Sequence, residues 1–161
     1  MGKLAERLAD ERRTGVYRVE VTEALDEAAA IVGLPILRIV LRDATGDRLL
    51  ASCAGAATSI PVHGWDDFSA AIADPAGAPP PGRVLLVECF DALLRLDPCA
   101  LEPLIAALQS AASQHRAHGR RFFAVFLDPE RRVALEPLYD RRRHAAVAAS
   151  AAIDQEHGGD R

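Results

Sequence analysis

The sequence predicts a small α/β domain in which helices cover a mainly parallel sheet of three to four strands. The first observation is that residues 83–88 and 121–127 are short runs of branched and aromatic residues. Neither run alternates apolar with polar residues, which is typical of strands buried on both faces of a parallel sheet. The second observation is the amphipathic helix between them, which returns the chain so that the second strand lies parallel to the first.

The length and composition fit one domain. The chain has 161 residues, and its apolar content of 50% is enough to build a core. We assign residues 1–140 to the domain. Residues 141–161 are predicted to form an alanine-rich tail that is helical or disordered.

The first elements follow from the spacing of apolar residues. Leu4 and Leu8 stand one helical turn apart in a charged segment, which predicts a short surface helix. Residues 16–21 alternate apolar and polar residues, so we expect a fourth strand with one wet face at an edge of the sheet. Thr22 can then cap a helix that ends at Gly33.

The middle of the chain continues this alternation. Residues 36–41 are the next predicted strand, and residues 46–58 form a helix of small side chains that can approach a sheet closely. Residues 64–73 predict a short helix with its apolar edge inward, since apolar residues recur at i, i+3 and i+7. The proline-rich residues 74–82 read as a connecting loop.

The helix between the two central strands has a clear end and an ambiguous start. We expect it to run from Pro103 to His118 and to end at Gly119 in the left-handed conformation. Asp97 and Pro98 have the form of an N-cap and a first-turn proline, but Pro103 would then break a hydrogen bond inside the helix. We therefore expect a kink or a restart there.

The sequence favours a cytoplasmic protein. No apolar run approaches the roughly 18 residues that span a bilayer, and the N-terminus is charged where a signal peptide is apolar. Cys53, Cys89 and Cys99 lack metal-ligand spacing, and each falls in a predicted strand or helix, so we expect three buried thiols rather than disulfides.

The charge pattern favours a basic protein partner. The net charge is −4 and the pI is near 5.7, which argues against a general nucleic-acid surface. Residues 141–143 are three arginines, but this basic cluster is short and lacks interleaved aromatic residues. His115 and His118 are interpreted as solvated charge or as complements to the end of their helix. We expect no direct contact with nucleic acid or membrane.

Two segments, GRVLLVECFDALLRLDPCALEPLIAAL and AHGRRFFAVFLDP, form the predicted strand, helix and second strand at the centre of the chain. Through these segments and the order of the elements, residues 4–140 resemble the barstar family, a group of small inhibitors of secreted ribonucleases. Residues 65–72 fall at the place of the recognition helix of that family, which has the general form W-D-A-L-x-D-C-L. The resemblance implies an intracellular inhibitor or immunity protein that plugs the basic active site of a ribonuclease, with an N-terminal extension to the family pattern.

The resemblance implies a partner-binding site at the start of the recognition helix, formed by His63, Trp65, Asp66 and Asp67. It implies no catalytic residue, no metal and no cofactor. Asp66 aligns with the first of two acids in the family's helix, but Ala70 stands at the second position. The loop before the helix is also shorter, and residues 60–63 replace its aromatic residues and glycines.

These departures leave alternatives open. The chain could be a non-inhibitory interaction domain that kept the scaffold after losing a nuclease. A small enzyme that uses His63, Asp66 and Asp67 is a third hypothesis, and it requires a concave pocket at these residues. The two aspartates could also serve only to stabilise the start of the helix, and Trp65 could belong to the core.

Overall fold

The computed structural model describes residues 2–139 of the chain. The predicted tail of residues 141–161 lies outside the described residues. Within residues 2–139, no helix has both the length and the apolar character needed to cross a membrane.

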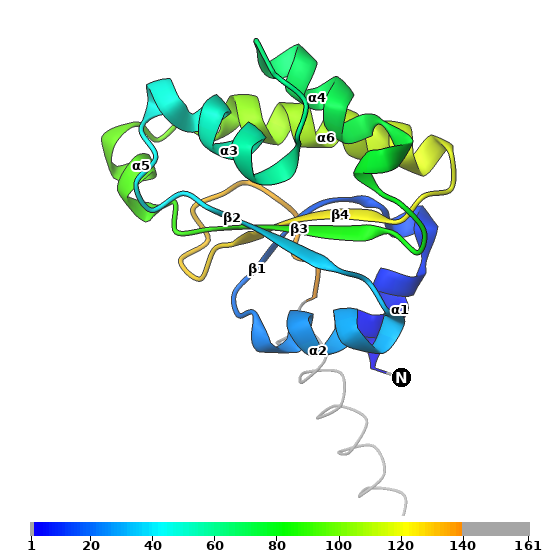
Figure 1. Cartoon of the computed structure of the whole chain (residues 1–161). Helices are drawn as coiled ribbons and strands as arrows, with labels where there is room; N and C mark the ends of the chain where they lie inside the picture. Colours follow the sequence, from blue (N-terminus) through cyan, green and yellow to red (C-terminus); the bar gives the residue numbers. More distant parts are fainter. Residues whose placement is uncertain (1, 140–161) are drawn as a thin grey trace, which may run out of the picture.

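A four-stranded, all-parallel sheet forms the centre of the domain, which confirms the predicted α/β fold (Figure 1). The strands are ordered β1-β4-β3-β2. Their bounds are β1 (Gly15–Val19), β2 (Ile36–Val40), β3 (Arg83–Glu88) and β4 (Phe122–Leu127). The amphipathic strand β1 lies at an edge, as its alternating pattern predicted, but it ends two residues earlier than expected because the chain turns toward the next helix at Glu20.

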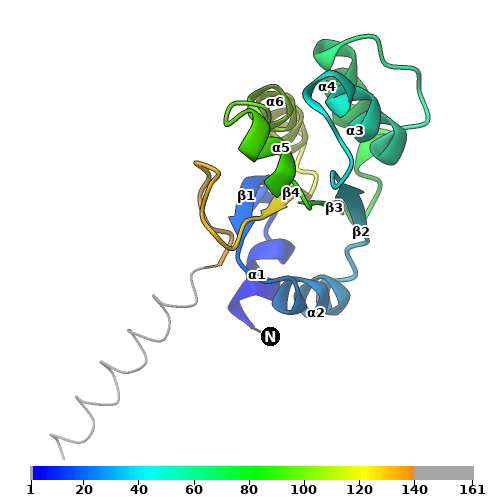
Figure 2. The same ribbon diagram turned by 90° about the vertical axis from the view of Figure 1, so that its left-hand side faces the viewer.

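Helices cover both faces of this sheet (Figures 1 and 2). The helices are α1 (Lys3–Ala9), α2 (Glu23–Val32), α3 (Leu49–Ala57), α4 (Trp65–Ala73), α5 (Asp91–Leu96) and α6 (Glu102–Ala117), with 3₁₀ turns at Glu11–Arg13, Gly46–Arg48 and Pro75–Gly77. One face is covered by α1 and α2, and the other by α3 to α6. The helical layers explain why the central strands contain no polar alternation.

The side chains of the central strands alternate between two cores. Val84 and Leu86 of β3 pack into the cluster that contains α1 and α2. Leu85 and Val87 pack into the cluster under α3, α4 and α6. All four side chains are fully or almost fully buried, so the strand has no face on which a polar residue could be solvated.

The start of the long helix is a restart. Helix α5 ends at Leu96, and the carboxylate of Asp97 then accepts a hydrogen bond from the backbone N–H of Cys99 (3.0 Å). Helix α6 begins at Glu102, which places Pro103 in the first turn, where its missing N–H costs no helical hydrogen bond. Gly119 follows the helix with φ 66°, in the predicted left-handed conformation.

The prediction of three buried thiols is wrong for two of them. Only Cys53 is buried, and this burial raises the pKa of its thiol to about 12. Cys89 is half-buried because β3 ends one residue before it, and Cys99 is exposed in the turn between α5 and α6. All three cysteines are free.

Three side-chain hydrogen bonds attach α4 to α6 and to the loop that follows α6. The Ser69 hydroxyl donates to the carbonyl of Ala107 (3.2 Å). His115 Nε2 lies 2.7 Å from the carbonyl of Ile72, and Arg120 Nη2 donates to the carbonyl of Ala73 (3.4 Å). These contacts hold both the middle and the end of α4 on α6, and therefore determine how the start of α4 is presented.

His115 is a neutral core residue, which corrects its interpretation as a helix-terminal charge. Since a carbonyl can only accept, Nε2 carries the proton that faces Ile72, while Nδ1 accepts from Arg120 Nε at 2.8 Å. The ring is fully buried and stacks on Phe122 with centroids 4.8 Å apart. Burial lowers the pKa of His115, and the positive charge of Arg120 lowers it further, although the Ile72 hydrogen bond acts in the opposite direction.

We predict that His115 makes the folded protein less stable in mild acid. The pKa of His115 is below its ordinary 6.5 in the folded state, so the unfolded chain binds more protons as pH falls below that value. The contribution of neutral His115 to the free energy of unfolding is complete above pH 6.5. It is lost as the pH falls from 6.5 toward the pKa of His115 in the folded protein. Urea unfolding at pH 7.5 and 5.5 should show a larger loss for the wild type than for His115→Gln.

The exposed His118 provides the matched control for this measurement. His118→Gln should retain the pH dependence of the wild type. Equal pH dependence in the wild type and in His115→Gln would contradict the assignment.

Candidate functional site

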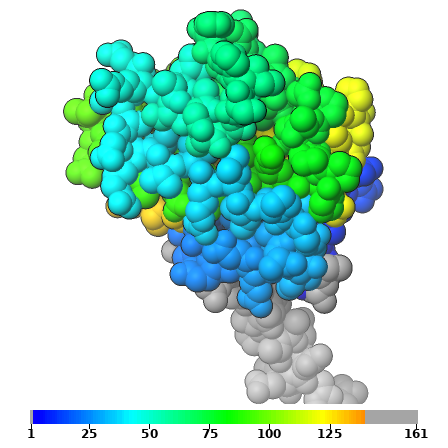
Figure 3. Space-filling model, in the orientation of Figure 1, coloured from blue at the N-terminus to red at the C-terminus, as the bar shows by residue number. Residues whose placement is uncertain are grey.

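The loop at residues 58–64 and the first turn of α4 project from the helical layer that lies farthest from α1 and α2 (Figures 1 and 3). Gly64 is the N-cap of α4, and Trp65, Asp66 and Asp67 form its first turn. The described structure therefore places the four predicted site residues, His63 and residues 65–67, together at one protruding helix start.

Asp67 stabilises this helix start. Its Oδ2 accepts a hydrogen bond from the backbone N–H of His63 at 3.1 Å. The third residue of α4 thus reaches back to the residue before the N-cap, as the acid of a capping box does for the N-cap itself. Its negative charge also lies at the positive end of the helix dipole. Stabilisation of the helix start, which is the alternative role considered for both aspartates, is therefore the role of Asp67.

Asp66 has a different environment. Its side chain is exposed, and within residues 2–139 its carboxylate takes part in no hydrogen bond or salt bridge. It is the second residue of α4, so its negative charge lies near the positive end of the helix dipole. A carboxylate held on a helix and free of protein partners is available to a cationic group from outside.

Trp65 and His63 differ in burial. The Trp65 ring is half-buried and packs edge to face on Phe68, with centroids 5.6 Å apart. It contacts the core under α3, α4 and α6, which fits the core alternative while leaving part of the ring accessible. His63 is exposed and is connected to the helix start only through its backbone N–H.

The layer formed by α3 and α4 carries only negative formal charge. Residues 49–82 include three aspartates and no lysine or arginine, although the chain has 19 basic residues in total. Asp74 is the third of these acids, and its Oδ1 accepts from the backbone N–H of Ala76 (2.9 Å). Ile60, in the loop before α4, is 58% exposed. The surface therefore combines an unpaired acid with an accessible apolar side chain.

The predicted site residues line neither of the two hollows that we describe. One hollow of about 410 Å³ lies beside the loop and is lined by residues such as Ile60, Asp74 and Arg83, and a larger one lies under α1 and α2. His63, Asp66 and Asp67 belong to neither hollow, and Figure 3 shows a protrusion at this end of α4.

Within residues 2–139, no three His, Cys, Asp or Glu side chains converge as metal ligands would. The hollow between α1, the end of β1 and α2 was not predicted from the sequence. The signal that could have revealed it is the row of Glu23, Glu27 and Ile31, spaced i, i+4 and i+8 on α2, away from the stripe of Leu25 and Ala29 that packs inward.

Comparison of the chain with protein-family models, with curated proteins and with solved structures found no match. The resemblance to the barstar family therefore remains a prediction that depends on the sequence pattern.

We predict unequal effects when the two acids at the start of α4 are removed. Asp67→Ala should lower the free energy of unfolding by about 1 kcal/mol, because it removes the acceptor for the His63 N–H. Asp66→Ala should cost a few tenths of a kcal/mol, because only its interaction with the helix dipole is lost. Urea denaturation of both variants measures the difference, and equal losses would show that Asp67 is not the structural acid.

Proposed function

We propose that this protein binds a basic protein through the start of α4 and acts as a barstar-like intracellular inhibitor or immunity protein for a ribonuclease. The observation that supports this proposal best is Asp66, an exposed and unpaired carboxylate within residues 49–82, a stretch without lysine or arginine. The order of α3, a loop, α4, β3 and the α5–α6 connection to β4 also agrees with what the family resemblance implies.

The chemistry of such an interface is electrostatic. A ribonuclease active site presents cationic groups where substrate phosphate binds, and the Asp66 carboxylate would supply negative charge at that place. Such a pair can contribute several kcal/mol when it is desolvated, and acidic surfaces speed the encounter with a cationic enzyme. His63, Trp65 and Asp67 would add contact area around this acid.

The position of Asp66 suits this role because hydrogen bonds fix its helix, α4, on the neighbouring helix α6. The hydrogen bonds from Ser69 and His115 attach α4 to α6, and Asp67 holds the first turn. A carboxylate on a fixed helix loses less conformational freedom on binding than one on a free loop. Affinity gained in this way does not require a large rearrangement of the protein.

Ala70 bears on whether the protein inhibits a barnase-like ribonuclease or is a non-inhibitory interaction domain. It is exposed one turn after Asp66, so the surface carries no second charge at the place where the family has one. Inhibition of a barnase-like enzyme should therefore be weak, and the partner should be a nuclease whose basic surface needs one strong contact. A non-inhibitory interaction domain on the same scaffold is the alternative that the same observation favours.

Binding to a panel of small secreted ribonucleases, measured by calorimetry together with inhibition of RNA cleavage, tests the proposal. Asp66→Ala should weaken binding by about tenfold or more with almost unchanged stability, because it removes the charge that pairs with the enzyme. Glu6→Ala, an exposed acid on α1 at the opposite layer, is the matched control and should bind like the wild type. Equal affinity of both variants would exclude α4 as the interface, and no binding by the wild type would exclude these ribonucleases.

The substitution Ala70→Asp distinguishes the inhibitor from the non-inhibitory alternative. For an inhibitor, a second carboxylate one turn from Asp66 should tighten ribonuclease binding by about tenfold, because it adds a second ionic contact. Ala51→Asp adds the same charge on the exposed face of α3 and should leave affinity nearly unchanged. An unaltered affinity for Ala70→Asp, measured in the same assay, would count against a barnase-like geometry.

A further inference from the structure

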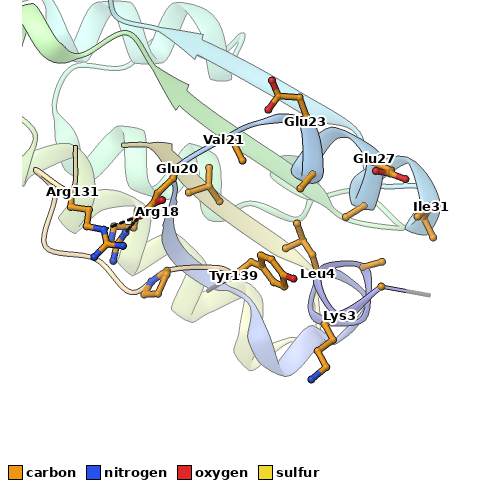
Figure 4. Close-up of a pocket in the computed structure, with 16 residues that line it drawn as sticks. Lys3, Leu4, Arg18, Glu20, Val21, Glu23, Glu27, Ile31, Arg131 and Tyr139 are labelled. Carbon is orange, nitrogen blue, oxygen red and sulfur yellow. Dashed lines mark hydrogen bonds and ion pairs between the residues drawn. The ribbon is translucent and has the colours of Figure 1, made fainter. Parts of the chain in front are cut away.

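The largest hollow that we describe lies on the side of the sheet opposite α4 (Figures 1 and 4). It has a volume of about 760 Å³ and runs between α1, the end of β1 and α2. We call it the α1–α2 groove. Its position means that an occupant would leave the start of α4 accessible.

The groove has an apolar surface that the described residues leave uncovered. Leu4, Val19 and Ala28 are buried and line it. Val21 and Ile31 also line it and are 46% and 56% exposed, so they are among the most exposed large apolar side chains of the domain. Because two such side chains meet in one hollow, the groove is a surface that another segment could cover.

Uncompensated acidic charge runs along one wall of the groove. Glu23 and Glu27 are exposed on α2, one turn apart, and neither forms a salt bridge within residues 2–139. The basic side chains of Arg18 and Arg131 in the groove are already directed at Glu20, at 4.0 and 2.8 Å. Lys3 of α1 is the other basic residue that lines the groove, so the acidic wall of the groove is the one formed by α2.

Residues 136–139 run along the edge of β1 and end at the α1–α2 groove. Residues 136–138 add to the outer edge of β1, where Arg18 N–H donates to the carbonyl of Glu136 (2.9 Å) and Leu138 N–H donates to the carbonyl of Arg18 (3.0 Å). The bridge between Arg18 and Pro137 is parallel, so the chain leaves in the direction of β1, toward Val21. The guanidinium of Arg7 also donates to the carbonyl of Leu138 (2.6 Å). Tyr139 itself lines the groove.

We propose that residues 141–153 of this same chain bind in the α1–α2 groove. The segment begins two residues after Tyr139 and reads RRRHAAVAASAAI, with three arginines followed by alanines, one valine and one isoleucine. The order of its chemistry matches α2, where Glu23 and Glu27 come before the exposed Ile31. The arginines pair with the two glutamates, and the apolar residues cover Val21 and Ile31.

Reach and stereochemistry both allow this arrangement. Ile31 stands eight residues after Glu23, which corresponds to a rise of about 12 Å along α2. A segment of eight to thirteen residues that starts beside Val21 covers this distance in either a helical or an extended form. The small side chains of the alanines permit a close approach to Ala24 and Ala28, which line the groove between the glutamates and the sheet.

The experiment uses the full chain with methyl-labelled valine and isoleucine. In the variant Arg141→Glu/Arg142→Glu/Arg143→Glu, the NMR signals of the Val21 and Ile31 methyl groups should shift, because the charge pairing with Glu23 and Glu27 is reversed. Combining it with Glu23→Arg/Glu27→Arg should return these signals toward their wild-type positions. Reversal of the exposed Asp43 and Asp47, which lie outside the groove, is the control and should neither shift nor restore them.

A second measurement follows trypsin cleavage after the three arginines by mass spectrometry. Cleavage in Glu23→Arg/Glu27→Arg should be about tenfold faster than in the wild type, because an occupied groove limits access of the protease to the bound segment. Unchanged methyl signals and unchanged cleavage would overturn the proposal. Methyl shifts that depend on protein concentration would also overturn it, because they would identify a second copy as the occupant.

Discussion

Strands β3 and β4 are buried on both faces, and this burial dictates how the helices are arranged around the sheet. Phe122, Phe123 and Phe126 are completely buried, and each is worth roughly 1.5–3 kcal/mol when it is removed from water. A parallel sheet with such strands cannot leave either face to solvent. The two helical layers are the consequence, and they place α1 and α2 on one side and α3 to α6 on the other.

The layer that carries α4 is fixed by a small number of directed contacts as well as by apolar packing. His115 is central among them, because one ring nitrogen donates to α4 while the other accepts from Arg120. Only the neutral imidazole makes both bonds at once, because an imidazolium has no ring lone pair with which to accept from Arg120. The helix that presents Asp66 thus depends on a buried polar group whose partners are all satisfied, and such networks favour one arrangement of the elements they join.

The two acids at the start of α4 show how neighbouring residues of the same type acquire different roles. Asp67 is directed back along the chain and completes the helix start, whereas Asp66 is directed to solvent. The position of each residue in the first turn decides this difference, since the third residue of a helix can reach the backbone before it. An interface built on this helix therefore offers the unpaired carboxylate of Asp66 to a partner, while the carboxylate of Asp67 stabilises the helix start.

The fold class, the strands and most helix ends could be predicted from the order of residues alone, because hydrophobic spacing and the residues Gly33, Pro103 and Gly119 act locally. The same spacing predicted the surface helix at residues 64–73 and its outward acids. The strand order, the burial of His115 and the position of the α1–α2 groove became visible only in the folded domain. These features join residues far apart in the chain, and local spacing contains no information on which distant partners meet.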